Sequence, residues 1–306
     1  MVAVTLEAVL VAVTDESPKT LVVPGGGGWR RLPAGPLDGD DRTLELGMRR
    51  VLRSQTGLEA GYAEQLYTFG DLDRSASPGE RSVSIAYLLL AQEEPVDAPA
   101  QWLDWYRLLP WEDHRLGRPQ VVDDVIEPAC RRWIDSAGED SERVRRQERA
   151  QVVFGLDGTA WDGVRVLERY ELLYELGLLA ESGSGAAGDG APLSSEELDL
   201  DHRRMAATAL GRLRGKLTYR PVVFELLPTT FTLLQLQRLV EALAGVRLHK
   251  QNFRRLVDSQ GLVEGTGLTA QTGGRPAELF RFRREVVRER PRPGVGTPWA
   301  GAGLSS

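Results

Sequence analysis

The stretch from Thr232 to Arg283 constrains the fold more than any other part of the chain, because it predicts two helices and a hairpin in direct succession. Thr232 is suited to begin the first helix, since its hydroxyl can accept a hydrogen bond from a free amide of the first turn. Gly245 and Gly261 stand where the two helices should end in a left-handed conformation. The apolar side of the first helix is predicted to consist of Leu233, Leu236, Val240 and Leu243.

The second helix is predicted from His249 to about Gln260, and its two sides differ in chemistry. Phe253, Leu256 and Val257 form an apolar side. The other side carries cations and amides, namely Lys250, Gln251, Asn252, Arg254 and Arg255. Arginine can donate two hydrogen bonds to guanine, and asparagine or glutamine can form two with adenine. Lysine and arginine also neutralise phosphates. This pattern predicts a helix that enters the major groove of DNA, and a merely solvated helix side is the alternative.

A basic hairpin is predicted after the second helix. Leu262-Val263 and the segment 279–283 are typical of strands, and residues 264–276 between them, with four glycines, are predicted to form a loop. Arg275 lies near the tip of this hairpin and joins the candidate DNA contacts. Helix, turn, basic helix and basic hairpin occur together, which favours nucleic-acid binding over simple solvation.

Charge is distributed unevenly along the chain. The 306 residues carry a net charge of −6, but residues 201–292 hold 18 Lys+Arg against 8 Asp+Glu, so the remainder carries −16. An acidic body with a basic C-terminal part indicates that only the latter meets a polyanion. No apolar run reaches the length of a membrane span, and the N-terminus lacks a basic leader. The single cysteine, Cys130, excludes an internal disulfide, so we expect a cytoplasmic protein without membrane contact.

The N-terminal part predicts a sheet and one capped helix. Strands are expected at residues 2–13, 21–23, 66–71 and 82–90. Gly25 to Gly28 are interpreted as a hairpin tip, because no Gly-Lys-Ser/Thr follows them as in a phosphate-binding loop. Thr43 caps a helix that runs to Gln55, and Gly57 ends it.

The segment from Trp29 to Leu58 resembles a Nudix box, whose pattern is G-x5-E-x7-R-E-U-x-E-E-x-G-U with U a bulky aliphatic residue. Arg50, Gly57 and Leu58 match this pattern. The four glutamate positions, however, are occupied by Arg42, Val51, Ser54 and Gln55. Nudix hydrolases need these carboxylates for magnesium or manganese, which activates water against a diphosphate. We therefore expect no catalytic residue, no metal site and no cofactor.

An enzyme nevertheless stays open as the alternative. A Nudix hydrolase cleaving nucleoside diphosphate derivatives such as ADP-ribose would need metal ligands elsewhere, for instance Glu45 or the acids of Asp38 to Asp41. A third possibility is a non-catalytic module whose C-terminal helices bind protein.

The middle of the chain is predicted to be helical. A helical insertion is expected at about residues 121–182, and a flexible Gly/Ala/Ser-rich linker at about 182–195. The aromatic residues between Trp102 and Trp111 could stack on a base, but more often such a cluster packs a core edge. His202 is interpreted as a structural residue in the first turn of a helix, and residues 291–306 as a disordered tail.

Several fragments together resemble the Nudix-related transcriptional regulators of the NrtR family. These fragments are RLRGKL, YRPVVFELLP, FTLLQLQ, NFRR and GRPAELFRF, within residues 201–283, and a looser resemblance covers residues 2–108. The resemblance implies an α+β fold. A Nudix-like α/β/α sandwich with a mixed sheet and the helical insertion (residues 1–227) would precede a winged helix-turn-helix domain (228–290).

The same resemblance implies a function. It implies a homodimeric bacterial repressor of NAD-related metabolism that binds a palindromic double-stranded DNA operator and senses ADP-ribose or a related nucleotide. Carried over by position, the DNA contacts would include Lys250, Asn252, Arg254, Arg255 and Arg275. The residues of the effector site stay open.

Overall fold

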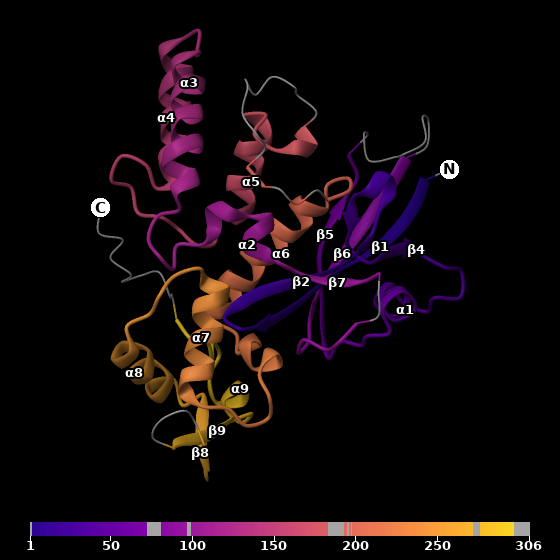
Figure 1. Ribbon diagram of the computed structural model, residues 1–306, viewed down its shortest axis with the longest axis vertical. Helices are drawn as coiled ribbons and strands as arrows, with labels where there is room; N and C mark the ends of the chain where they lie inside the picture. The colour runs from indigo at the N-terminus through magenta and orange to yellow at the C-terminus, as the bar shows by residue number, and fades with distance from the viewer. Residues whose placement is uncertain are drawn as a thin grey trace.

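The computed structural model describes residues 2–71, 81–96, 99–182, 193–194, 196, 198–271 and 276–296. Along its longest axis, a protruding helical part, a central sheet with helices on both sides and a smaller helix–hairpin unit follow one another (Figure 1). No helix in the described ranges is long and apolar enough to cross a membrane.

A mixed sheet forms the central part, as predicted. Its strands are β1 (Val2–Thr14), β2 (Ser17–Pro24), β3 (Arg30–Arg31), β4 (Ala34–Pro36), β5 (Tyr62–Phe69), β6 (Arg81–Leu90) and β7 (Gln101–Asp104). The strand order is β3-β2-β1-β6-β5, with β4 also paired to β1 and β7 to β2. Only β1 and β6 run parallel, and the other pairs of this sheet are antiparallel.

The two faces of β1 are buried under different helices, which makes the sheet the middle layer of a sandwich. Leu6 and Leu10 pack with Met48 of α1 (Leu44–Thr56) on one face. Val9, on the opposite face, belongs to the same core as Met205 of α6 (His202–Leu217). Because successive side chains of a strand point to opposite faces, this alternation follows directly from the apolar sequence of β1.

Helix α1 has the predicted ends, whereas β2 and β5 begin four residues earlier than predicted, β2 at Ser17. The Thr43 hydroxyl accepts from the amide of Leu46 at 3.2 Å, and Gly57 follows the helix with φ 72°. Strand β5 starts at Tyr62, four residues before the predicted start at residue 66, because Tyr62 already pairs with Leu90 of β6. The strand thus pairs with β6 from Leu90 back to Ser84.

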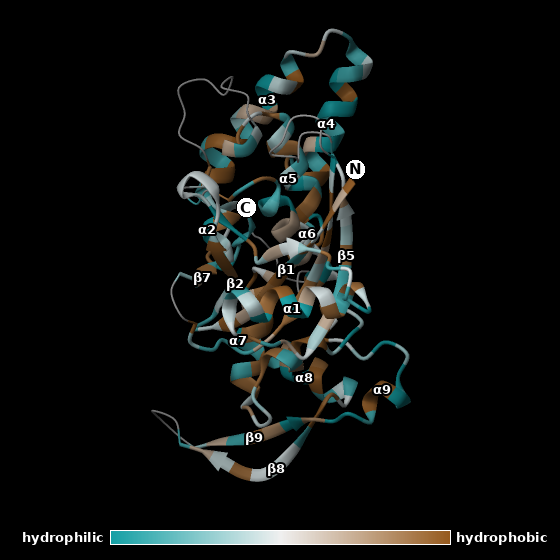
Figure 2. Cartoon of the chain, turned by 90° about the vertical axis from the view of Figure 1, so that its right-hand side faces the viewer, coloured by the Kyte–Doolittle hydropathy of each residue, from teal (hydrophilic) through white to brown (hydrophobic). Residues whose placement is uncertain are grey.

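The predicted insertion consists of helices that rise from the sandwich (Figure 1). They are a π-helical turn (Val122–Ile126), α3 (Glu127–Asp135), α4 (Asp140–Phe154) and α5 (Val166–Glu175), preceded by α2 (Trp105–Leu108). Trp105 and Trp111 are fully buried, so these aromatic residues pack the core and are closed to a stacked base. In Figure 2 the protruding α4 is mostly hydrophilic.

Most of the predicted flexible linker, about residues 182–195, lies outside the described residues. Ser194 near its end is buried and donates to the carbonyl of Arg107 at 2.7 Å, so the linker ends before this residue.

The C-terminal part contains the two predicted helices and the hairpin. Its elements are α7 (Leu233–Ala244), α8 (Lys250–Gln260), β8 (Val263–Ala270), β9 (Ala277–Phe282) and α9 (Val286–Glu289). The capping box of Thr232 and Gln235 is present, and Gly245 and Gly261 adopt positive φ at the two helix ends. The predicted loop at 264–276 was too long, because β8 pairs with β9 as far as Ala270 across an irregularity between Gly265 and Thr269.

The first residues of the predicted disordered tail are not all free of the body of the protein. Val295 is 2% exposed, and its amide donates to the carbonyl of Leu217 at 2.7 Å. Gly294 lies so close to Thr218 that a Cβ would stand 2.4 Å from the Thr218 carbonyl carbon. Residues 294 and 295 are therefore packed against the end of α6, and residues 297–306 lie outside the described residues.

Candidate nucleic-acid interface and nucleotide cleft

Helix α8 presents its polar side to solvent, as the sequence predicted. Phe253 and Val257 are 3% and 0% exposed and fix the helix to the body of the domain. The predicted contact residues on this helix are all exposed: Lys250, Gln251, Asn252, Arg254 and Arg255. Among the described residues, no acid forms an ion pair with Lys250, Arg254 or Arg255, so their charges are available to a polyanion.

Within α8, two of these residues contact each other. The Arg255 guanidinium donates to the Asn252 side-chain oxygen at 3.1 Å. Arg255 follows Asn252 by three positions, so both side chains lie over the same outward surface of the helix. Such an amide–guanidinium pair can be presented together to the edges of bases.

The hairpin of β8 and β9 is anchored to the residues just before α7. Phe231 exchanges two backbone hydrogen bonds with Phe280, at 2.9 and 2.8 Å. The ring of Phe224 stacks on that of Phe282 with centroids 4.3 Å apart. Arg275, the predicted contact in the hairpin, lies outside the described residues.

A second candidate site is a cleft of about 430 Å³ between the sheet, α1 and the start of α6. The side chains that offer polar atoms to it include Thr5, Arg31, Gln55, Ser82, Ser84 and His202. A volume of this size lies in the range of small-ligand pockets, which is about 300–1,000 Å³. The sequence alone leaves this site open, because its residues come from separate segments of the chain.

His202 links two of these segments at the back of the cleft. Its Nδ1 accepts from the amide of Leu32 at 3.0 Å, and its Nε2 lies 3.4 Å from a carboxylate oxygen of Glu7. Glu7, in turn, accepts from the hydroxyl of Ser84. His202 therefore has the structural role in the first turn of α6 that the sequence predicted, and it also joins α6 to the cleft.

The positions that would carry Nudix glutamates make structural contacts instead. Gln55 holds β4 to α1, donating to the carbonyl of Ala34 at 2.7 Å and accepting from its amide at 3.3 Å. Val51 is buried, and its methyl group would lie 3.0 Å from a Cβ placed on Gly35. The Ser54 hydroxyl donates to the carbonyl of Val51 at 2.9 Å. This alkyl, hydroxyl and amide set does not fit magnesium, because it lacks the carboxylates through which proteins hold that ion.

Two of the alternative metal ligands are engaged by arginines. Asp41 accepts two hydrogen bonds from Arg50, at 2.9 and 2.7 Å, and this guanidinium lowers the pKa of Asp41 to about 2. Glu45 pairs with Arg49 at 2.9 Å. Among the residues in the described ranges, no group of three or more His, Cys, Asp or Glu side chains is arranged to hold a metal ion.

A buried charge cluster that sequence analysis did not predict connects the two parts of the molecule. Glu112, Arg169 and Arg214 have fully buried side chains. Arg169 binds both carboxylate oxygens of Glu112, at 2.5 and 3.0 Å, and Arg214 binds one of them. Burial alone would raise the pKa of Glu112, but the two arginines outweigh it and hold this pKa below its ordinary value.

Arg214 extends this cluster to the end of α7. Its Nε donates to the carbonyl of Leu243 at 3.0 Å. The next turn is closed by Gly245, where a Cβ would lie 2.4 Å from the Glu112 carbonyl oxygen. Tyr106 also donates its hydroxyl to the carbonyl of Ala242 at 2.5 Å, so the C-terminal end of α7 is fixed to the sandwich.

The turn between α7 and α8 is tied to the sandwich by a second set of charges. Glu241, which is 1% exposed, accepts from the amide of Leu248 at 3.0 Å and pairs with Arg247 at 2.8 Å. Arg247 also pairs with Glu16 in the turn between β1 and β2, at 2.8 Å. The position of α8 thus depends on contacts with the N-terminal sheet.

Taken together, the fold and the sites define a two-domain class of protein: a Nudix-like sandwich without its metal carboxylates, followed by a helix–turn–helix with a hairpin wing. Residues 223–282 match the NrtR DNA-binding winged helix domain. These residues therefore match a winged helix domain of the NrtR type, and the residues before them have a Nudix-like fold.

Two solved structures share the fold over most of the chain. The crystal structure of Shewanella oneidensis NrtR complexed with a 27mer DNA has the same fold, with a TM-score of 0.59 and 22% identity over 93% of this chain and 95% of that one. A MutT/nudix family protein from Enterococcus faecalis gives a TM-score of 0.54 and 17% identity over 92% of this chain and 87% of that one.

A curated relative matches a shorter stretch. The ADPR responsive transcriptional repressor NtrR of Acinetobacter baylyi is 38% identical over 86 residues, which make up 28% of this chain and 34% of the relative.

Proposed function

We propose that this protein is a DNA-binding transcriptional repressor of NAD-related metabolism, whose Nudix-like domain binds ADP-ribose or a related nucleotide without hydrolysing it. The observation that carries the proposal is the exposed face of α8, where two amides stand beside three cations that have no acidic partner in the described ranges. The Acinetobacter baylyi relative is an ADPR responsive transcriptional repressor. Its description supports DNA binding and nucleotide binding as the two activities proposed here. Contact with chromosomal DNA also implies a cytoplasmic location.

The DNA contacts of this proposal are the side chains predicted from the sequence, and they divide by chemistry. Arg254, Arg255 and Asn252 suit base edges in the major groove, and Lys250 at the first turn suits a phosphate. Gln251 and Arg275 complete the set. The domain boundary of this proposal lies at residues 227 and 228, with the winged helix domain reaching to residue 290.

The cleft of about 430 Å³ suits the nucleotide. Arg31 lines it and pairs with no acid in the described ranges, so its guanidinium can meet a phosphate. Hydroxyl groups of Thr5, Ser82 and Ser84 can bond ribose oxygens. His202 lines the cleft and is the first residue of α6. A nucleotide in the cleft would therefore contact the helix that packs against α7.

A homodimer would place two α8 helices on one face of a palindromic operator. Half-sites that lie one helical turn apart, roughly 34 Å, need two recognition helices at a matching distance. A nucleotide that fits the cleft better in another dimer geometry would change this distance and weaken DNA binding.

Selection of bound fragments from a random DNA pool tests this function. We expect a palindromic sequence to be enriched by the full chain, and its enrichment to fall when ADP-ribose is present. Enrichment of no sequence above the random pool would contradict the proposal. The hydrolase alternative is tested by incubating the protein with ADP-ribose and magnesium, where turnover that a chelator abolishes would favour an enzyme.

A further inference from the structure

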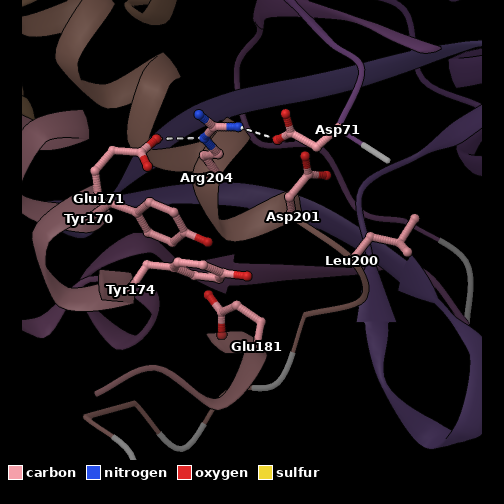
Figure 3. A pocket seen from close by; sticks show the side chains of 8 residues that line it. All are labelled: Asp71, Tyr170, Glu171, Tyr174, Glu181, Leu200, Asp201 and Arg204. Carbon is pink, nitrogen blue, oxygen red and sulfur yellow. Dashed lines mark hydrogen bonds and ion pairs between the residues drawn. The ribbon is translucent and has the colours of Figure 1, made fainter. Parts of the chain in front are cut away.

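A second cavity, of about 420 Å³, lies between α5, the start of α6 and the segment after β5. Two tyrosines, four carboxylates and one arginine contribute to its lining (Figure 3). It is distinct from the nucleotide cleft, although Leu200 lines both. None of the expected DNA contacts and none of the degenerate Nudix positions belongs to it.

The charges around this cavity leave it negative. Arg204 is shared by Glu171, at 2.6 Å, and Asp71, at 2.8 Å. Arg203, which is buried, pairs with Glu181 at 2.8 Å. With Asp201 as the fourth carboxylate, four acids stand against two guanidinium groups. The described residues therefore give the cavity an excess of two negative charges.

Glu181 offers one of its oxygens to the cavity. Its side chain is 7% exposed, and Oε1 accepts from Arg203. Oε2 is buried and has no hydrogen-bond partner among the described residues. Figure 3 shows this carboxylate directed toward the space beside the Tyr174 ring. A buried carboxylate oxygen without a partner is costly, so a bound donor or cation would stabilise it.

The two tyrosines supply an aromatic wall. The rings of Tyr170 and Tyr174 have centroids 6.2 Å apart, and Tyr174 is 44% exposed while Tyr170 is 2% exposed. Burial and then the negative charge of Glu181 raise the pKa of Tyr170 above its ordinary value, with Asp201 and Glu171 adding to the effect. The raised pKa agrees with a negative potential inside the cavity.

We propose that this cavity binds a quaternary ammonium cation, with the charge against the Tyr174 ring and the Glu181 carboxylate. Aromatic faces attract such weakly hydrated cations, and neighbouring carboxylates add Coulomb attraction. The volume suits a small organic molecule better than a bare metal ion, which also needs convergent ligands that the described residues do not offer. This proposal does not depend on DNA binding or on the nucleotide in the other cleft.

Isothermal titration of the full chain with choline tests the proposal, and 3,3-dimethyl-1-butanol serves as its neutral isostere. We expect choline to bind, the isostere to bind at least about tenfold more weakly, and added salt to weaken choline binding. Tyr174→Leu should weaken choline by roughly 2- to 30-fold, the range of a cation–π contact. Glu181→Gln should weaken it as well, because the amide removes the negative charge.

Matched variants separate the site from general effects. Tyr67→Leu changes another exposed tyrosine outside the cavity, and Glu175→Gln neutralises an exposed acid that pairs with Arg149. Both should bind choline as the parent does. Equal affinity for choline and its isostere, no binding of choline to the folded chain, or parent-like affinity in Tyr174→Leu would each overturn the proposal.

Discussion

Lys250, Arg254 and Arg255 stand in the first two turns of α8, and each is exposed without an acidic partner in the described ranges. Arg204, Arg214 and Arg247, by contrast, make short contacts with acids. Surface arginines that pair internally gain little from a new anion, whereas unpaired ones can neutralise phosphates.

At the scale of a single residue, Arg255→Ala tests whether α8 contacts DNA. We expect DNA affinity to fall by roughly 1–3 kcal/mol if Arg255 makes a bidentate base contact. Arg53→Ala is the matched control, because Arg53 is an exposed arginine on α1 far from α8 in the chain. Equal affinity of both variants in a gel-shift titration at fixed salt would remove Arg255 from the interface.

Glu112→Gln tests the buried charge cluster. The substitution leaves two buried guanidinium groups without their anion, and breaking such a pair costs about 3–5 kcal/mol. We expect this loss in the free energy of unfolding measured with urea, whereas Glu142→Gln, in a partly exposed pair with Arg146, should change it by less than about 1 kcal/mol.

The dependence of stability on pH follows from the lowered pKa of Glu112. The folded protein lowers the pKa of Glu112 from its ordinary value of 4.5. The stabilisation is therefore complete above pH 4.5 and is lost as the pH falls through the lower pKa of the folded state. Urea unfolding between about pH 7 and pH 3 should show a smaller loss in Glu112→Gln than in the parent, and parallel curves would contradict this role.

At the scale of elements, local patterns could be predicted and long-range contacts could not. The ends of α1, α7 and α8 follow from caps such as Thr43, Thr232 and Gly245, which act within one turn. Glu112, by contrast, meets Arg169 across 57 positions and Arg214 across 102. Nothing in the local pattern of PWEDH or RLRGKL indicates that these charges are buried together.

The same contrast explains the errors in the element boundaries. Glycines at 265 and 267 predict a loop, yet backbone pairing with β9 continues β8 to Ala270. The glycine- and arginine-rich end predicts disorder, yet one apolar residue, Val295, packs beside Leu217. The outward face of α8 could be predicted because the helical period alone determines which residues it contains. The cleft could not be predicted, because its residues come from separate segments that only the fold brings together.

Gly245→Ala tests the connection between α7 and the sandwich. Gly245 has φ 72°, and an added Cβ would stand 2.4 Å from a backbone oxygen of Glu112. We therefore expect alanine to lower the stability by more than the backbone strain of a positive φ would. Gly57→Ala is the matched control, since Gly57 has the same φ of 72° and a Cβ there would meet nothing within 4 Å among the described residues. Thermal unfolding of both variants measures the difference, and equal destabilisation would mean that the contact at Gly245 is unimportant.

At the scale of the whole molecule, negative and positive charge are concentrated in different parts of the chain. The excess of positive charge lies in residues 201–292, and the sheet reaches α8 through Glu16, Arg247 and Glu241. A rearrangement at the sheet can therefore be passed to the recognition helix through this chain of contacts.

Salt dependence tests the electrostatic part of this account. Each neutralised phosphate contributes about −0.9 to the slope of log K against log salt for duplex DNA. We expect a steep negative slope for the full chain, and Lys250→Ala should make it shallower by about one unit per subunit. A flat dependence would indicate that the C-terminal helices bind a protein instead.

The most direct test combines DNA release with the fate of the nucleotide. A labelled operator, bound by the full chain in the presence of magnesium, is titrated with ADP-ribose, and the nucleotide is then recovered and quantified by chromatography. The account predicts that the operator is released in a saturable manner while the ADP-ribose is recovered intact. Release that requires cleavage of ADP-ribose, or an operator affinity that ADP-ribose leaves unchanged, would contradict it.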